Sequence, residues 1–278
     1  MVNLRGFTNH ANILNMSEEK RQSLNQLLSR FPPGSVLPTR WLTGHGYADN
    51  LLPRYVAQGW LASLGHGAYV RPGVETGWAE VVHALQDLLQ LPLHVGGSTA
   101  LDQRGHAHYL RFGSGTVLLY GTRRLPKWAT ELKLKDRLEW RSGRLFEFPG
   151  RVDESGRGLL HYRPQGERHE LLVAGEERAF LEYLDEMPTR ASVHEGDLVM
   201  QGLTGLRPAL VSSLLKHCTS YKVKRLFLAL AQRHQHAWLK HLDLAGVDLG
   251  KGKRTLTPGG KYDKRFLITL PADLDDLG

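Results

Sequence analysis

The chain of 278 residues contains a single cysteine, Cys218, so an intrachain disulfide is excluded. It contains no apolar run that approaches the roughly 20 residues needed to cross a bilayer, and its N-terminus lacks the apolar core of a signal peptide. The apolar neighbours Leu214 and Leu215 predict that Cys218 is an inert core thiol and not a nucleophile. These absences favour a cytoplasmic protein.

Motifs for catalysis and metal binding are also scarce. The closest histidine pairs, His106-Ala107-His108 and His234-Gln235-His236, do not have the spacing of a zinc site. The chain has neither a nucleophile-elbow motif nor the G-x-x-x-x-G-K-[ST] pattern of a phosphate-binding loop. We therefore expect no cofactor and no metal ion, and the sequence favours a protein that is not an enzyme.

One motif points the other way. The run Gly96–Leu101 lies between an expected strand and an expected helix. Nucleotidyltransferases use a Gly-Ser turn in this position to hold a nucleotide phosphate on backbone N–H groups. That chemistry also needs two or three carboxylates to hold metal ions. The next expected strand, 117–120, carries none, and neither Asp102 nor Asp153 fits the spacing. We interpret the motif as a structural turn, and a nucleotidyltransferase-fold enzyme is the least favoured reading.

Positive charge is present in excess and unevenly distributed. The net charge is +8, and residues 209–270 alone carry twelve Lys and Arg against three Asp and Glu. Residues 1–74 carry seven against three, whereas residues 166–208 are acidic, with four against nine. A polyanion is the expected partner of the N-terminal region, because DNA releases counterions when Lys and Arg approach its phosphates.

The segment from Leu37 to Pro72 begins with the pattern of two short helices. Pro38 can open the first helix, and the glycines at 44 and 46 end it. Asn50 is expected to cap the second helix with its side-chain oxygen, and Gly59 follows that helix as a C′ glycine.

A hairpin pattern follows the second helix. The runs Trp60–Leu64 and Ala68–Val70 flank the short loop Gly65-His66-Gly67. Helix, turn, helix and hairpin is the layout of a winged helix-turn-helix, in which the second helix enters the DNA major groove and the hairpin wing touches the backbone.

The polar residues of this unit match that interpretation, because Asn, Gln and Arg can pair bidentately with base edges. The expected DNA-binding residues are Thr39, Arg40, Tyr47, Asn50, Arg54, Gln58, His66, Tyr69 and Arg71. The alternatives are a winged helix that binds a protein, or a small α+β element whose polar residues are only solvated.

The domain limits follow from the flanking patterns. A helix begins near Ser17 and places Leu24, Leu27, Leu28 and Phe31 on one face. We expect a disordered tail at 1–16, a winged helix-turn-helix domain at 17–73, and an α+β domain at 74–278 with a possible further boundary near 166.

The remainder of the chain mixes helices and strands. Strands are expected at 93–95, 117–120, 145–148 and 266–270, and helices at 75–90, after Gly96, at 176–186, 193–203, from Pro208 and at 221–233. The fold class is therefore α+β, with a winged helix-turn-helix followed by a mixed domain whose C-terminal part is mostly helical.

The last basic region is expected to form one surface. Val223, Leu226, Phe227 and Leu230 give helix 221–233 an apolar face, so its charges should point outward. The expected basic surface comprises Lys222, Lys224, Arg225, Lys251, Lys253, Arg254, Lys261, Lys264 and Arg265. A solvated face without a partner is the alternative.

Residues 222–271 resemble the C-terminal block of AbiEi-type antitoxins of type IV toxin–antitoxin systems. Residues 94–110 resemble an internal motif of that family, and the hairpin at 59–73 resembles its winged-helix domain. The resemblance implies repression of the protein's own operon through promoter inverted repeats in double-stranded DNA. It also implies that the protein counteracts a nucleotidyltransferase-like AbiEii toxin functionally, with or without a stable complex.

Other readings stay open at this point. A winged-helix regulator whose C-terminal domain binds a ligand or dimerises would share the N-terminal pattern. The protein is expected to be a monomer in solution or a dimer on DNA, since one winged helix covers too little DNA for high specificity.

Overall fold

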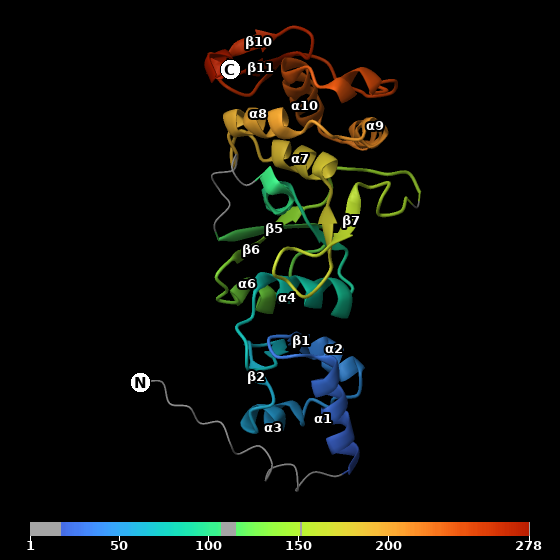
Figure 1. Ribbon diagram of the computed structural model, residues 1–278, viewed down its shortest axis with the longest axis vertical. Coiled ribbons are helices and arrows are strands. Elements are labelled where there is room, and N and C mark those ends of the chain that lie inside the picture. The colour runs from blue at the N-terminus through green and yellow to red at the C-terminus, as the bar shows by residue number, and fades with distance from the viewer. Residues whose placement is uncertain (1–17, 107–114, 151, 278) are drawn as a thin grey trace. The chain divides into compact units, whose positions relative to one another are not determined.

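The computed structural model describes residues 18–106, 115–150 and 152–277 (Figure 1). These residues form two compact units. The first contains residues 18–91 and 125–135, and the second contains the other described residues. The tail expected at 1–16 lies outside the described residues. None of the helices in the described part of the chain is both long and apolar enough to cross a membrane.

The first unit contains the predicted winged helix-turn-helix. Its helices are α1 (Glu18–Arg30), α2 (Thr39–Gly44) and α3 (Leu52–Ala57). Its strands are β1 (Val36–Pro38), β2 (Ala62–Ser63) and β3 (Ala68–Val70). They form an antiparallel sheet of order β1-β3-β2. The sequence pattern did not predict β1, which is short and enters α2 directly.

The core of this unit is formed where α1, α2 and α3 meet. Leu24 and Leu27 of α1 are buried there, as the helical spacing predicted. Phe31 packs edge-on against Trp41, with ring centroids 5.1 Å apart. The helices are too short to be stable alone, so this shared core holds them in place.

The first unit continues beyond Gly73, the limit expected from the sequence. Helix α4 (Trp78–His83) runs into the π-helical turn η2 (Ala84–Leu88), which contacts β1. Helix α6 (Lys127–Glu131) returns to this unit from much later in the chain.

The second unit is built on a mixed five-stranded sheet of order β6-β5-β4-β8-β7. Its strands are β4 (Leu93–Val95), β5 (Thr116–Gly121), β6 (Arg137–Ser142), β7 (Leu159–Tyr162) and β8 (Leu171–Ala174). The β4–β8 and β5–β6 pairs are parallel, and the β4–β5 and β7–β8 pairs are antiparallel.

Helices pack around this sheet and extend to the C-terminus. They are α5 (Gly97–Leu101), the π-helical turn η3 (Asp102–His106), α7 (Glu176–Asp185), α8 (Val193–Gly202), α9 (Pro208–His217), α10 (Tyr221–His234) and the 3₁₀ turns η5 (Ala237–His241) and η6 (Ala272–Leu277). A small sheet of β9 (Arg254–Thr255), β10 (Lys261–Asp263) and β11 (Ile268–Leu270) follows α10. Helix α7 contacts α5, α9 and α10, so it connects the sheet to the C-terminal helices.

The predicted α+β class is confirmed, but the prediction of a strand at 145–148 is wrong. Phe146 makes only an isolated antiparallel bridge to Cys218, because the segment crosses the chain after α9 instead of joining the sheet. The sheet uses β6, β7 and β8, which the sequence pattern did not predict. Cys218 is buried, and burial raises its pKa to about 11, as expected of an inert thiol.

Candidate nucleic-acid interface

Helix α3 is fixed at both ends by backbone geometry. Its N-cap residue is Leu51, which makes no side-chain capping bond, and Pro53 occupies the first turn. The expectation that Asn50 caps this helix is wrong, because the chain turns into the helix one residue later. Gly59 has φ +75° and its N–H donates to the Val56 carbonyl oxygen, so it is the C′ glycine that was predicted.

One face of α3 is exposed. Pro53, Arg54 and Ala57 are exposed at helical spacing, and Asn50 is exposed in the turn before the helix, whereas Leu52 and Tyr55 on the opposite face are buried. Gln58, at the edge of this face, is half-buried, and its Oε1 has no hydrogen-bond partner among the described residues. Asn50 and Arg54 are therefore both accessible from solvent, one before the first turn of α3 and one within it.

Helix α2 supports α3 and exposes part of its own first turn. Arg40 is exposed, and Thr39 is half-buried with its N–H bonded to the carbonyl oxygen of Gly67 in the hairpin. Trp41 is buried and stacks on His45 with ring centroids 3.9 Å apart. The hydrogen bond from Thr39 to Gly67 ties the first turn of α2 to the wing.

Tyr47 was expected to face DNA and instead belongs to the core. It is buried, and its ring stacks at 6.4 Å from that of Trp41. Burial raises the pKa of its phenol, and the charge of Arg30 offsets this in part. Its ring is thus part of the apolar core of the unit, where burial stabilises an aromatic side chain more than solvation does.

The wing keeps two of its three expected DNA contacts accessible. His66 is exposed at the tip and Tyr69 is half-buried on β3. Arg71 is oriented inward, because its guanidinium donates to the carbonyl oxygens of Leu28 and Phe31 at the end of α1. Arg71 therefore closes α1 onto the wing, and the expectation of a phosphate contact there does not fit its position.

The glycine motif of the second unit meets a buried carboxylate. The backbone N–H of Gly97 donates to Oε2 of Glu182 at 3.1 Å. His94 Nε2 and Arg178 Nε lie 2.7 and 2.8 Å from the other oxygen, Oε1. A Cβ at Gly96 would lie 2.2 Å from Glu182 Oε2, so only glycine fits. An amide of this turn is thus used inside the fold, as the structural interpretation of the motif predicted.

The expected basic surface near the C-terminus is smaller than predicted, because residues 223–231 of α10 are buried all round the helix. Arg225 is buried and donates to the carbonyl oxygens of Leu249, Gly252 and Leu267 at 2.6, 2.7 and 3.0 Å. Lys224 is buried against the ring of Tyr221.

Lys222 is also drawn inward, and its Nζ donates to the carbonyl oxygens of Asp185 and Met187. The expectation that the charges of this helix point outward is therefore wrong for Lys222, Lys224 and Arg225. Lys222 binds the end of α7, and Arg225 binds the chain that follows α10.

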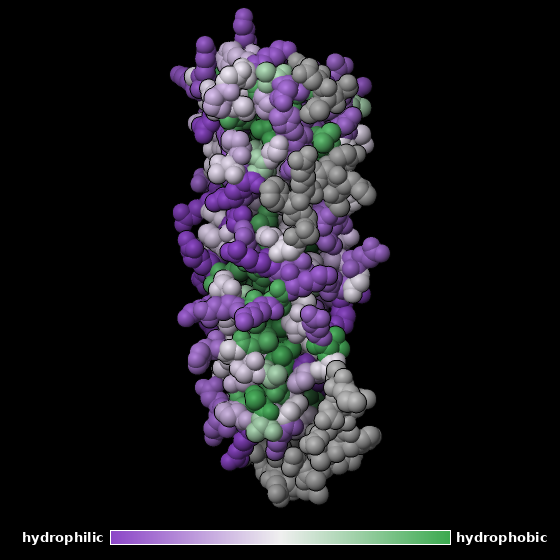
Figure 2. Space-filling model, turned by 90° about the vertical axis from the view of Figure 1, so that its left-hand side faces the viewer, coloured by the Kyte–Doolittle hydropathy of each residue, from purple (hydrophilic) through white to green (hydrophobic). Residues whose placement is uncertain are grey.

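The other six residues of that set are exposed. They are Lys251, Lys253, Arg254, Lys261, Lys264 and Arg265, and we call them the C-terminal basic cluster. Lys253 lies over the ring of Tyr262 and Arg265 over that of Phe266, at 5.0 and 5.3 Å from the ring centroids. Hydrophilic side chains project around this part of the second unit, at the top of Figure 2.

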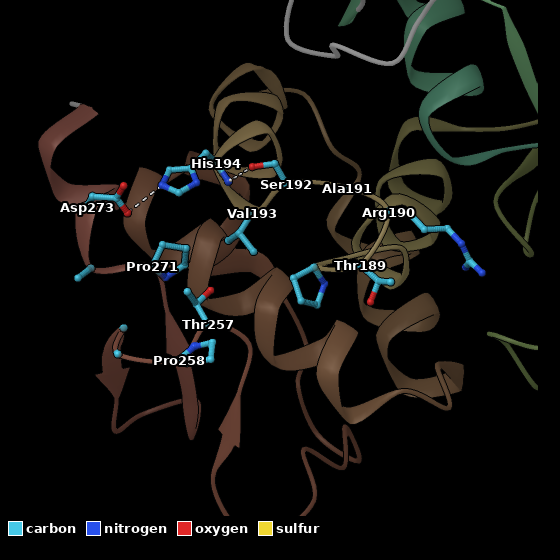
Figure 3. Close-up of a pocket in the computed structure, with 14 residues that line it drawn as sticks. Thr189, Arg190, Ala191, Ser192, Val193, His194, Thr257, Pro258, Pro271 and Asp273 are labelled. Carbon is cyan, nitrogen blue, oxygen red and sulfur yellow. Dashed lines mark hydrogen bonds and ion pairs between the residues drawn. The ribbon is translucent and has the colours of Figure 1, made fainter.

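A pocket of about 680 Å³ lies beside the start of α8 (Figure 3). Prolines 188, 258 and 271 line it, together with His194, whose Nε2 is 2.9 Å from Oδ1 of Asp273. The hydrogen bond from His194 lowers the pKa of Asp273. Among the described residues, no group of three or more His, Cys, Asp or Glu could hold a metal ion.

Comparison with known proteins covers nearly the whole chain. A family model described as the N-terminal domain of the AbiEi antitoxin transcriptional regulator matches residues 20–112. A second, described as a transcriptional regulator, AbiEi antitoxin, type IV TA system, matches residues 114–271. The crystal structure of the RV2827C protein from Mycobacterium tuberculosis is similar in fold, with a TM-score of 0.57 and 14% sequence identity over 95% of each chain. No curated protein matches the chain at a significant level.

Proposed function

We propose a function from the following premise: the chain belongs to the family of AbiEi antitoxin transcriptional regulators of type IV toxin–antitoxin systems. The proposed function is that the protein represses its own operon. In this proposal it binds inverted repeats in the promoter and also counteracts an AbiEii-like toxin with a nucleotidyltransferase fold. Membership of the family supports a regulatory antitoxin role. The binding of inverted repeats and the way in which the toxin is counteracted are what we propose in addition.

The exposed face of α3 is the observation that supports DNA binding most strongly. Arg54 can pair with the O6 and N7 atoms of guanine, and Asn50 with adenine, if α3 enters the major groove. Arg54 is exposed on α3, whose opposite face is buried, and Asn50 is exposed in the turn just before it, so binding would need no rearrangement of the core.

Specific binding should require two copies of the protein. Helix α3 has only six residues, so one copy reads few base pairs. Two copies on an inverted repeat double the base contacts, and cooperation between them raises the effective affinity if the half-site spacing matches.

The C-terminal basic cluster is the part that supports antitoxin action outside the DNA-reading helix. Its six cations lie in a region with few acids, and they attract an acidic surface or a nucleic acid. We propose that this cluster antagonises the toxin, either through the toxin itself or through the RNA that the toxin needs.

A footprint on the operon's own promoter tests the repressor half. We expect wild-type protein to protect two inverted half-sites together. Full affinity for a fragment that carries one half-site would contradict the two-copy arrangement, and absence of any protection would contradict autoregulation.

A growth-rescue assay with the toxin expressed tests the antitoxin half. The full-length variant Lys251→Glu, Lys253→Glu, Arg254→Glu should rescue growth poorly, while the control Arg54→Ala should rescue as well as wild type. Equal rescue by the triple variant and wild type would contradict the proposed role of the cluster.

A further inference from the structure

The wing of this protein is poor in cations that are free to meet phosphates. Arg71 is the only Lys or Arg in residues 59–73, and its guanidinium is bonded to the backbone of α1. The exposed residue at its tip is His66, which is neither Lys nor Arg. If the wing binds the DNA backbone, the Lys or Arg side chains that contact the phosphates must therefore come from another part of the chain.

The segment 125–135 supplies such charge. It connects β5 to β6 of the second unit, yet it belongs to the compact first unit. Trp128 of this segment is buried, and a Cβ at Gly67 in the wing would lie 3.0 Å from its Cδ1. Gly67 has φ +114°, a conformation that suits glycine, and its missing side chain leaves room for the indole against the wing.

The exposed side chains of the segment 125–135 are mostly basic. Lys127, Lys133 and Lys135 are exposed, and Glu131 is the only acid in the segment. Lys127 and Glu131 lie 3.4 Å apart at 84% and 63% exposure. An ion pair this exposed contributes little, so a phosphate can compete for Lys127 at small cost.

We infer that the segment 125–135 is a DNA-backbone contact that accompanies the wing, with Lys127, Lys133 and Lys135 binding phosphates next to the half-site. This inference rests on the proposed DNA binding and deepens it. Because the segment is continuous with β5 and β6, it also makes DNA affinity depend on residues outside the winged helix.

The test uses full-length Lys127→Gln, Lys133→Gln, Lys135→Gln in fluorescence-anisotropy titrations over a series of salt concentrations. Each duplex, the promoter repeat and an unrelated sequence, should be bound about 10- to 100-fold more weakly. The slope of log affinity against log salt should become shallower by about 2–3, because each lost phosphate contact removes about 0.9.

The control carries the same charge change at exposed positions of the second unit, Arg144→Gln, Lys216→Gln, Lys240→Gln. If the test variant loses no more affinity than this control, or loses affinity for the promoter alone, the backbone contact is overturned. The proposed function fails separately, if wild-type protein has no preference for the promoter. Unchanged melting temperatures of both variants show that folding is intact.

Discussion

Nε2 of His94 lies 2.7 Å from Oε1 of Glu182, and both side chains are buried. Arg178 binds the same carboxylate, and Gly97 donates its N–H to the second oxygen. Burial alone would raise the pKa of Glu182, but the charge of Arg178 and the hydrogen bonds from Arg178 and His94 lower it on balance. This network joins β4, the start of α5 and α7, so we expect it to support the whole second unit.

Replacing Glu182 with Gln should lower the free energy of unfolding by about 3–5 kcal/mol, because Arg178 would be left buried without its counter-charge. Denaturant unfolding followed by circular dichroism measures the change. The matched control is Glu170→Gln, which removes an exposed carboxylate 3.7 Å from exposed Arg163 and should cost less than about 0.5 kcal/mol. Similar losses for the two variants would contradict a supporting role for the network.

The stability should fall as pH falls below the ordinary histidine pKa of about 6.5. Burial lowers the pKa of His94 in the folded chain, although the charge of Glu182 opposes this. The unfolded chain therefore takes up the proton first, and the contribution of His94 is full above pH about 6.5 and is lost below it. His94→Gln should have a flatter dependence between pH 7 and 5, whereas exposed His161→Gln should follow wild type. Parallel curves for His94→Gln and wild type would count against a neutral buried His94.

Gly96→Ala should cost about 2–4 kcal/mol, because the new methyl group would lie 2.2 Å from Glu182 Oε2 and 2.7 Å from the Tyr120 ring. Gly205→Ala is the control, since a Cβ there has nothing within 4 Å and its φ is not positive. Thermal unfolding of the two variants compares them directly. A melting temperature of Gly96→Ala equal to that of Gly205→Ala would mean that the turn tolerates a side chain.

Arg71→Met should destabilise the first unit by about 1–3 kcal/mol, because two hydrogen bonds to α1 carbonyl oxygens are lost. It should leave the salt dependence of DNA binding unchanged, in contrast to a residue that binds phosphate. Exposed Arg40→Met should do the reverse, with stability kept and the salt dependence reduced. A smaller salt slope for Arg71→Met would restore Arg71 to the DNA-contacting set.

The sequence predicted the winged helix well because its signals are local. The apolar spacing in α1 spans two helix turns and Gly59 directly follows α3, and the structure bears out both. The N-cap of α3 was predicted one residue too early. The prediction relied on the capping side chain of Asn50, whereas the N-cap residue is Leu51, which makes no side-chain capping bond.

The sequence failed where a side chain depends on a partner far along the chain. Helical spacing shows which residues of α10 face one core, but it cannot show that the loop at 249–252 covers Arg225 on the other side. In the same way, nothing local to Trp128 indicates that it packs against Gly67. The burial of Glu182 could not be predicted from the sequence, because an acidic residue in a helix is ordinarily solvated.

The central claim is that α3 reads bases through Arg54, and anisotropy titration of full-length Arg54→Ala against the promoter repeat tests it most directly. We expect the affinity for the repeat to fall by about 1–3 kcal/mol while the affinity for an unrelated duplex changes little. Arg163→Ala, an exposed arginine of the second unit, should bind both duplexes like wild type. Unchanged affinity of Arg54→Ala for the repeat, or an equal loss on both duplexes, would contradict the account.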